Sequence, residues 1–317
     1  MNPQEILLSI VFCFQTLLGM LGNSFLICLF ILVFLTGHTL RPIDPILTQL
    51  AFANSLVLLC KGIPQTMAAL GLKNFLDDGG CKTVFYLHRV ARGLSLSMTC
   101  LLSGFQAITI SPRVSRWAEL KARIPKYITA TCVSCWTFYL LFCITVIENI
   151  KGPGSSRNSS DTHQYEYCFA SVKTKEYRIL STFIFSLPDA MCVSFLVLAS
   201  GYMVLLLSRH QKQVQHIHKT SHSSSRVSHE IRATQAILLQ ASAFVCFYSL
   251  NSILVAYMHS RNPILGLVQC SAFLASCFPT VSPFLLICTD SQVLRYYGGL
   301  WPRNVALFNL SVCPSWA

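Results

Sequence analysis

The sequence predicts an all-α membrane protein, folded as a bundle of seven transmembrane helices. Seven apolar stretches are each long enough to cross a bilayer, whose hydrocarbon core of ~30 Å needs ~20 residues of helix. Apolar residues make up 53% of the chain and charged residues only 11%, a composition typical of polytopic membrane proteins. Seven spans in 317 residues leave almost no room for a soluble domain.

The expected spans follow one another with short connections, except for one long loop at 150–178. Their ranges are 6–35, 45–70, 82–111, 127–149, 179–207, 233–258 and 265–288. Only five residues precede the first span, without a Lys or Arg, so we expect this span to be its own insertion signal and not a cleaved leader. Residues 1–288 therefore form one bundle, and 289–317 form a short tail.

The Lys and Arg residues between the spans predict the orientation of the chain. Thirteen cations fall on the side that includes the tail, and eight fall on the other side, five of them in the long loop where charge counts for less. The positive-inside rule then places the amino terminus outside and the carboxyl terminus in the cytoplasm. The net charge of +12 is explained by this topology, and nucleic acid is not an expected partner.

Cysteine and asparagine positions agree with this orientation. Twelve of the fifteen cysteines lie within spans and Cys313 lies in the tail, which leaves Cys81 and Cys168, both on the predicted outer side. An oxidising compartment would join them, although two free thiols are the alternative. The long loop also carries Asn158-Ser159-Ser160, a glycosylation acceptor on the outer face, whereas the acceptor at Asn309 lies in the inner tail.

Motifs for catalysis, cofactors or metals are not found in the sequence. A zinc-protease His-Glu-x-x-His, a Gly-rich phosphate loop and a nucleophile elbow are all absent, so neither an enzyme nor a cofactor is expected. His216 and His218 have histidine neighbours that could hold a metal, but a solvated loop is the simpler interpretation because no Cys or carboxylate cluster completes a site.

Several short motifs follow one another in a fixed order along residues 20–304. They include Leu21-Gly22-Asn23, Lys61-Gly62-Ile63-Pro64-Gln65-Thr66-Met67, Leu87-His88-Arg89-Val90-Ala91-Arg92-Gly93, Ile110-Ser111-Pro112, Ser200-Gly201-Tyr202 and Phe278-Pro279-Thr280-Val281-Ser282-Pro283. In order and spacing the chain resembles the vomeronasal type-1 receptors, a family of G-protein-coupled receptors. The Asp-Arg-Tyr, Cys-Trp-x-Pro and Asn-Pro-x-x-Tyr motifs of the large rhodopsin-like group are missing.

The resemblance implies a chemosensory receptor of the plasma membrane of a sensory neuron. It would bind small pheromone-like molecules and activate a heterotrimeric G protein of the inhibitory class. Bitter-taste receptors are the nearest similar group, but they lack the Leu-His-Arg-Val-Ala-Arg run at 87–92. A transporter or channel is the alternative from another class, in which buried charges would line a conduction path.

Charged side chains inside the predicted spans suggest a ligand site. Arg89 and Arg92 lie roughly 12 and 16 Å below the outer end of the third span and share one helix face. Such charges are costly in lipid and should face the bundle interior. Asp189 in the fifth span matches the depth of Arg92, so we expect these two to pair and Arg89 to be the arginine more available to ligand; a purely structural pair is the alternative.

Lys61 and His88 complete the candidate set. Lys61 lies within reach of the outer surface, where it could snorkel, or it could join the cavity. In the second case three cations face one buried carboxylate, with Glu148 at the rim. Such a cavity favours a small, largely apolar ligand with an anionic or strongly accepting group.

The inner loops at 112–126 and 208–232 are basic. Seven of their cations are candidates for facing the G protein, which would present acidic patches to them: Arg113, Arg116, Lys121, Arg123, Arg209, Lys212 and Lys219. Topology and attraction to anionic lipid head groups explain the same charges equally well.

Overall fold

The computed structural model describes residues 3–37, 40–72, 75–111, 115–152, 162–164, 167–171, 175–217, 224–260, 265–289 and 293. The tail at 294–317 and Asn158 lie outside this part of the chain. Within it, seven helical segments are long and apolar enough to cross a membrane. Their ends differ from the predicted spans by at most four residues, so the predicted fold class is confirmed.

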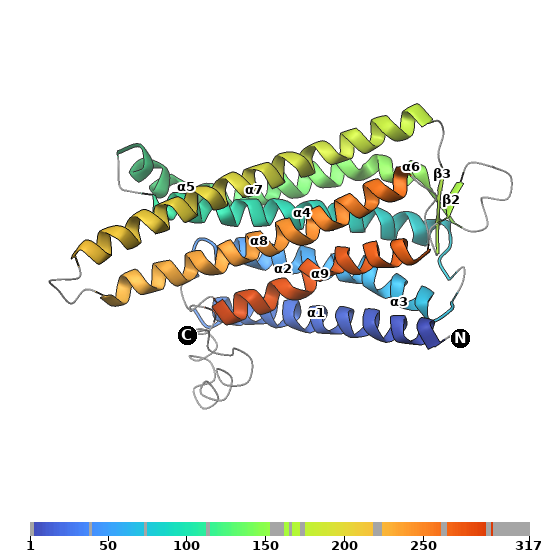
Figure 1. Cartoon of the computed structure of the whole chain (residues 1–317), viewed down its shortest axis with the longest axis horizontal. Coiled ribbons are helices and arrows are strands. Elements are labelled where there is room, and N and C mark those ends of the chain that lie inside the picture. The colour runs from blue at the N-terminus through green and yellow to red at the C-terminus, as the bar shows by residue number, and fades with distance from the viewer. Residues whose placement is uncertain are drawn as a thin grey trace.

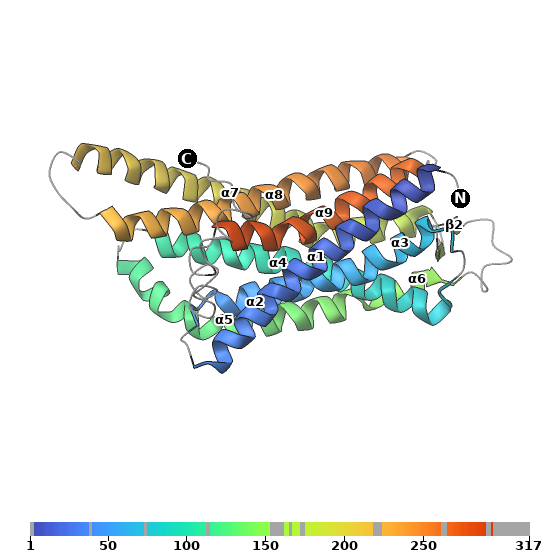
Figure 2. The ribbon, with the colours of Figure 1, turned by 90° about the horizontal axis from the view of Figure 1, so that it is seen from below.

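The helices run lengthwise beside one another and alternate in direction (Figures 1 and 2). The segments are α1 (Pro3–Leu35), α2 (Asp44–Val57), η1 (Leu58–Gly62), α3 (Ile63–Ala69), α4 (Asp78–Ile110), α5 (Ser115–Phe142), η2 (Cys143–Thr145), α6 (Val146–Asn149), α7 (Lys175–Ile217), α8 (Ser224–Ser260) and α9 (Leu265–Thr289). Spans two and four are therefore each built from several helical pieces.

The second span is interrupted by a π-helical turn, η1, directly before Pro64. Proline has no backbone N–H, and its ring clashes with the carbonyl four residues earlier, which here belongs to Cys60. The wider turn accommodates this conflict, and the N–H of Ile63 bonds to the carbonyl of Leu58, five residues back. Lys61 lies inside this turn.

The centre of the bundle is formed by the second and third spans. In their most apolar windows 61% of residues are buried, against 17% in the fourth and fifth spans. Leu50 of α2 packs in one core with Leu94, Met98 and Leu102 of α4, all fully buried. The outer faces of α5 and α7 instead present large apolar side chains, such as Phe138 and Leu198, as expected where lipid is the solvent.

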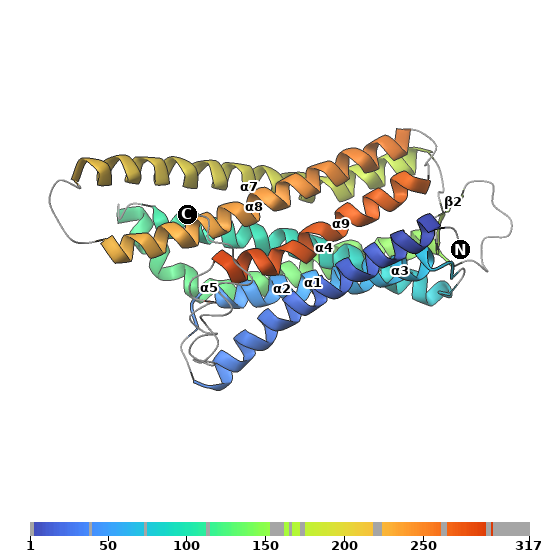
Figure 3. The ribbon, with the colours of Figure 1, turned by 60° about the horizontal axis from the view of Figure 1, so that its bottom comes forward.

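A small antiparallel sheet was not anticipated from the sequence. Its strands β1 (Ile150–Lys151), β3 (Phe169–Ser171) and β2 (Thr162–Gln164) lie in the order β1-β3-β2 within the long loop. The sheet lies at the same end of the bundle as the beginning of α1 (Figure 3). The short strands pair because backbone groups of a loop crossing the bundle end need partners. Which side of the membrane this end faces stays a prediction.

Candidate functional site

The half of α4 that follows Cys81 directs two arginines toward aromatic rings of neighbouring helices. The guanidinium carbon of Arg89 lies 4.7 Å from the ring centre of Phe185 in α7. That of Arg92 lies 4.7 Å from the ring centre of Tyr248 in α8. Both arginines are half-buried, and cation–π contacts of this kind contribute about 0.5–2 kcal/mol, more when water is excluded. The two arginines therefore point into the bundle, as the sequence predicted.

Tyr248 stands between the expected partners Arg92 and Asp189. Its hydroxyl donates a hydrogen bond to the carboxylate of Asp189, while its ring faces Arg92. Arg41 is paired with Asp44 and Lys82 with Asp78, whereas no ion pair joins Arg92 to Asp189, both of which the structure describes. The predicted direct pair is thus replaced by a link through Tyr248, because the phenol can satisfy the carboxylate and present its ring to the cation at once.

A cavity of about 40 Å³ lies beside this link, between the second, third, sixth and seventh spans. Its polar wall is formed by Arg92, Ser95, Tyr248 and Asn251. The rest is apolar: Val57, Phe244, Phe247, Leu274, Ala275, Phe278 and Pro279. Arg89 is not part of this wall, and which of the two arginines is nearer a ligand stays a prediction. Water-sized occupants fit this volume, whereas small-molecule pockets typically reach about 300–1,000 Å³.

Lys61 and His88 lie at the same level of the bundle. The charges of Lys61, Arg89 and Arg92 all act on His88, and Asp189 acts on Arg89. The Nδ1 atom of His88 is buried and has no hydrogen-bond partner among the described residues. Lys61 is half-buried, and whether it joins the cavity or snorkels stays a prediction. Arg89 therefore lies close to Asp189, Arg92 is linked to it through Tyr248, and Glu148, which was predicted at the rim, is exposed.

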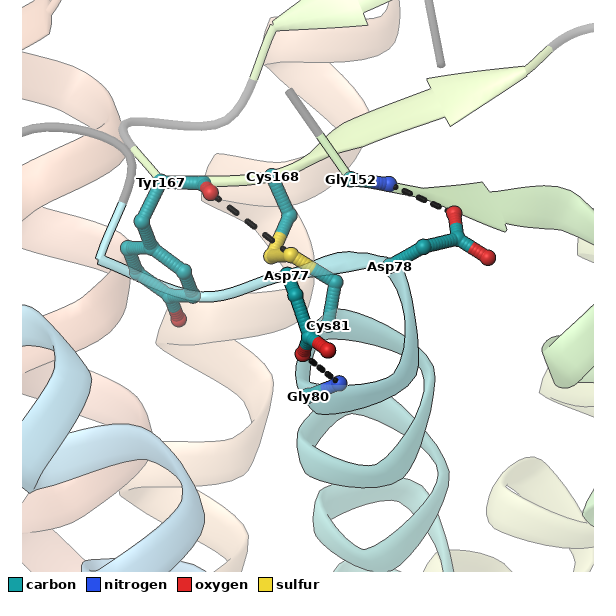
Figure 4. The surroundings of a disulfide bond; sticks show 7 residues. All are labelled: Asp77, Asp78, Gly80, Cys81, Gly152, Tyr167 and Cys168. Atoms are coloured by element: carbon teal, nitrogen blue, oxygen red, sulfur yellow. Dashed lines mark hydrogen bonds between the residues drawn. A yellow bond between two sulfur atoms is a disulfide. The ribbon is translucent and has the colours of Figure 1, made fainter. Parts of the chain in front are cut away.

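The predicted disulfide is confirmed. Cys81 and Cys168 are bonded, with an S–S distance of 1.98 Å, and both are fully buried (Figure 4). The long loop is also held by the N–H of Gly152, which donates to Asp78 over 2.9 Å. The N–H of Gly80 donates to Asp77 over 2.7 Å and caps the beginning of α4. The disulfide thereby attaches the long loop to the first turn of α4.

The inner basic residues are described only in part. Arg123 and Arg209 are exposed. The backbones of Arg116, Lys121 and Lys212 belong to α5 and α7, but their side chains, like the whole of Arg113 and Lys219, lie outside the described structure. The proposal that these cations face a partner therefore rests on the sequence.

The aromatic members of the site were missed by sequence reasoning. Phe185, Phe244 and Tyr248 come from apolar stretches with many similar residues, and nothing in the spacing of one helix shows which ring lies opposite a charge on another. A weak signal existed for Tyr248, since a buried tyrosine hydroxyl normally finds a hydrogen-bond partner.

Comparisons with known proteins agree with this architecture. A family model described as "Vomeronasal organ pheromone receptor family" matches residues 6–298. The chain is 46% identical over 306 residues to human (Homo sapiens) vomeronasal type-1 receptor 1, covering 96% of this chain and 86% of that protein. It is 41% identical over 305 residues to human vomeronasal type-1 receptor 3, covering 96% and 97%.

Among solved structures, squid rhodopsin superposes with a TM-score of 0.73 over 97% of this chain and 82% of its own. At 14% identity this shows a shared fold only. Together with the family match, it identifies a multi-pass membrane protein of the G-protein-coupled receptor type, with chemosensory relatives. The chain belongs to the vomeronasal organ pheromone receptor family, whose members include the vomeronasal type-1 receptors.

Proposed function

We propose that this receptor binds a small semiochemical with an anionic or strongly accepting group in the outer half of the bundle. The observation that carries the proposal is the positive charge inside the bundle beside Asp189: Arg89 lies close to this carboxylate, and Arg92 is linked to it through Tyr248. Net positive charge away from water is costly, so an anionic ligand group would be favoured there. The buried Nδ1 atom of His88 could bond to the same ligand.

Ligand binding would have to widen the cavity beside Arg92, because about 40 Å³ cannot contain a whole semiochemical. The wall is shared by α2, α4, α8 and α9, so a ligand that enters would separate these helices. A ligand that binds the wider form better shifts the population of the bundle toward it. In this proposal the wider form engages an inhibitory-class heterotrimeric G protein at the basic inner face.

The proposed setting is the plasma membrane of a chemosensory neuron, with the amino terminus outside, Asn158 glycosylated and the tail in the cytoplasm. The proposal is tested by expressing the receptor with a G-protein activation reporter and applying steroid sulfates and neutral volatiles. Agonist-dependent activation without a ligand-independent current supports a receptor. A current without activation would support a transporter or channel.

Replacing Arg92 by glutamine is expected to lower the potency of anionic agonists by about tenfold to a hundredfold, with neutral agonists less affected. Hydrogen bonds to a charged group contribute about 1.5–3 kcal/mol, which corresponds to that range. The measurement is the concentration for half-maximal activation at equal surface expression. Arg89→Gln is the matched comparison, because Arg89 packs on Phe185 outside the cavity wall. A larger loss in Arg89→Gln would reverse the two roles.

Asp189 and Tyr248 are expected to behave as one unit. Asp189→Asn and Tyr248→Phe each disrupt the same hydrogen bond, so the double variant should lose less thermal stability than the sum of the single losses. A coupling energy of about 0.5–3 kcal/mol is typical of residues in contact. A double-mutant cycle on purified receptor measures it, and strictly additive losses would show that the two side chains act independently.

A hydrogen bond between uncharged side chains joins the third and sixth spans at the predicted inner end. In the proposal, the G protein would detect a ligand-driven separation of these helices there. The side-chain amide of Gln106 donates to the hydroxyl of Thr234 over 3.2 Å, and both residues are buried. Gln106→Leu is expected to raise basal G-protein activation about twofold to tenfold, since a buried hydrogen bond contributes about 0.5–1.5 kcal/mol. Thr109→Val is the control, because the Thr109 hydroxyl bonds within its own helix. Unchanged basal activity would exclude this bond as a restraint.

A further inference from the structure

A second, larger space lies on the outside of the bundle, away from the charged site. A groove of about 400 Å³ runs between α5 and α7. Since α4 packs against both of these helices, it forms the floor. The groove is lined by Ile46, Ser97, Cys100, Leu101, Gly104, Phe105, Ile108, Tyr127, Ile128, Thr131, Cys135, Cys192 and Phe195, none of which carries a charge.

The groove opens toward the bilayer. Its side walls belong to the fourth and fifth spans, the two least buried spans of the bundle, and Tyr127 and Phe195 on these walls are 60% and 48% exposed. The floor is low because position 104 has no side chain; a Cβ atom there would lie 3.1 Å from Cζ of Phe195. Hydrocarbon, and not water, is therefore the medium that meets this groove.

The shape of the groove suits one hydrocarbon chain. Along α4 it extends from Ser97 to Ile108, roughly 16 Å at 1.5 Å per residue. A volume of about 400 Å³ over that length gives a cross-section of roughly 25 Å². A helix of another receptor copy, about 10 Å or more in diameter, is too wide for it.

One end of the groove is marked by positive charge. Tyr127 lies on that end wall, and Arg123, one helical turn earlier, lies on the same face of α5. Lys126 directly precedes Tyr127, and both cations are exposed. The small sheet lies at the opposite end of the bundle (Figure 1). Under the predicted orientation the cations are at the cytoplasmic leaflet, where anionic lipids concentrate.

We propose that this groove is a binding site for an anionic phospholipid of the cytoplasmic leaflet. One acyl chain occupies the groove between α5 and α7, and the phosphate and carboxylate of a phosphatidylserine-type head group lie at Arg123 and Lys126. Apolar contact along the groove and attraction to the two cations act on the same molecule. A sterol shares the apolar part of this chemistry but has no charge for the cations. This inference is independent of the ligand chemistry proposed for the cavity beside Arg92.

The test is native mass spectrometry of the full receptor, purified in detergent and incubated with equal amounts of phosphatidylserine and phosphatidylcholine of the same acyl chains. We expect phosphatidylserine to be retained about tenfold more. In the double variant Arg123→Gln, Lys126→Gln that preference should disappear, whereas Arg209→Gln, an exposed cation on α7 at the same end, should leave it unchanged. Equal retention of the two lipids by the wild type, or an equal loss in Arg209→Gln, would overturn the head-group assignment.

The acyl-chain position is tested separately by filling the groove. Thr131→Phe places a ring in the groove, and the lost hydroxyl bonds to the carbonyl of Tyr127 in its own helix. Its control is Val133→Phe, two residues later on α5, where the side chain is 59% exposed and outside the groove. Thr131→Phe should reduce retention of both lipids about tenfold, with thermal stability near that of the control. Unchanged retention in Thr131→Phe, or displacement of phosphatidylserine by an equal amount of sterol, would refute the site.

Discussion

Replacing Gly93 by valine is expected to remove most folded receptor from the cell surface. Gly93 is buried in α4 against the ring of Tyr139 in α5. A Cβ atom at this position would lie 2.2 Å from Cε1 and 2.4 Å from Cδ1 of that ring, closer than non-bonded atoms can approach. Tyr139 is only 4% exposed, and its hydroxyl accepts a hydrogen bond from Ser97 over 3.2 Å, so the ring has no free direction in which to move.

Overpacking of a close-packed core costs about 1–3 kcal/mol or more, a large part of the ~5–15 kcal/mol stability of an ordinary domain. The measurements are surface labelling and the thermal midpoint of the purified protein. Gly201→Val is the matched control, since Gly201 is also in a membrane helix but has nothing within 4 Å of an added Cβ. Combining Gly93→Val with Tyr139→Ala should restore part of the surface expression. Normal expression of the single variant would mean that α4 and α5 do not approach as described.

Removing the disulfide is expected to have the second large effect. The double variant Cys81→Ser, Cys168→Ser opens a loop whose ends are 87 residues apart in sequence. Crosslinks of this kind stabilise by about 2–5 kcal/mol, with longer loops at the upper end in the chain-entropy model. The long loop should also lose its covalent attachment to the first turn of α4, so the backbone amides of its described strands should exchange faster with solvent.

Thermal unfolding and hydrogen exchange measure these two consequences separately. Cys13→Ser provides the control, because Cys13 is a free, exposed cysteine in α1. Cys81 and Cys168 are replaced together so that neither is left as a free thiol that could form a disulfide with another cysteine. A double variant as stable as the Cys13→Ser control would show that the hydrogen bond between Gly152 and Asp78 holds the loop without the disulfide.

The fold could be predicted far more completely than the site. Membrane spans follow from apolar length alone, which is a local property, and the two outer cysteines were distinguishable by elimination. The depth of Arg92 and Asp189 along their helices was also predictable from the rise per residue. Their relation in the plane of the membrane was not, because it depends on helix rotation and on which ring fills the space between them. Tyr248 occupies that space, and no feature of α4 or α7 specifies it.

The same limit explains why the neighbours of Arg89 and Arg92 could not be predicted. Residues three apart on a helix share a face only approximately, and the difference of about 60° in direction turns Arg89 toward α7 and Arg92 toward α8. The π-helical turn and the small sheet were missed for another reason. Each results from a local backbone conflict, at Pro64 and in the long loop, whose resolution is not encoded in hydropathy.

The π-helical turn also changes how positions along the second span correspond to those of a regular helix. One extra residue in a turn displaces everything after it by about 100° around the helix axis relative to an uninterrupted α-helix. A count of 3.6 residues per turn from Asn54 therefore gives the wrong direction for each residue of α3. It assigns to each residue the direction that its neighbour in the sequence has. The burial of Gln65 and the exposure of Ile63 have to be explained with the helix phase of the segment around Pro64, after the π-helical turn. Comparing this span with that of a receptor lacking the turn requires a one-residue gap between the two halves.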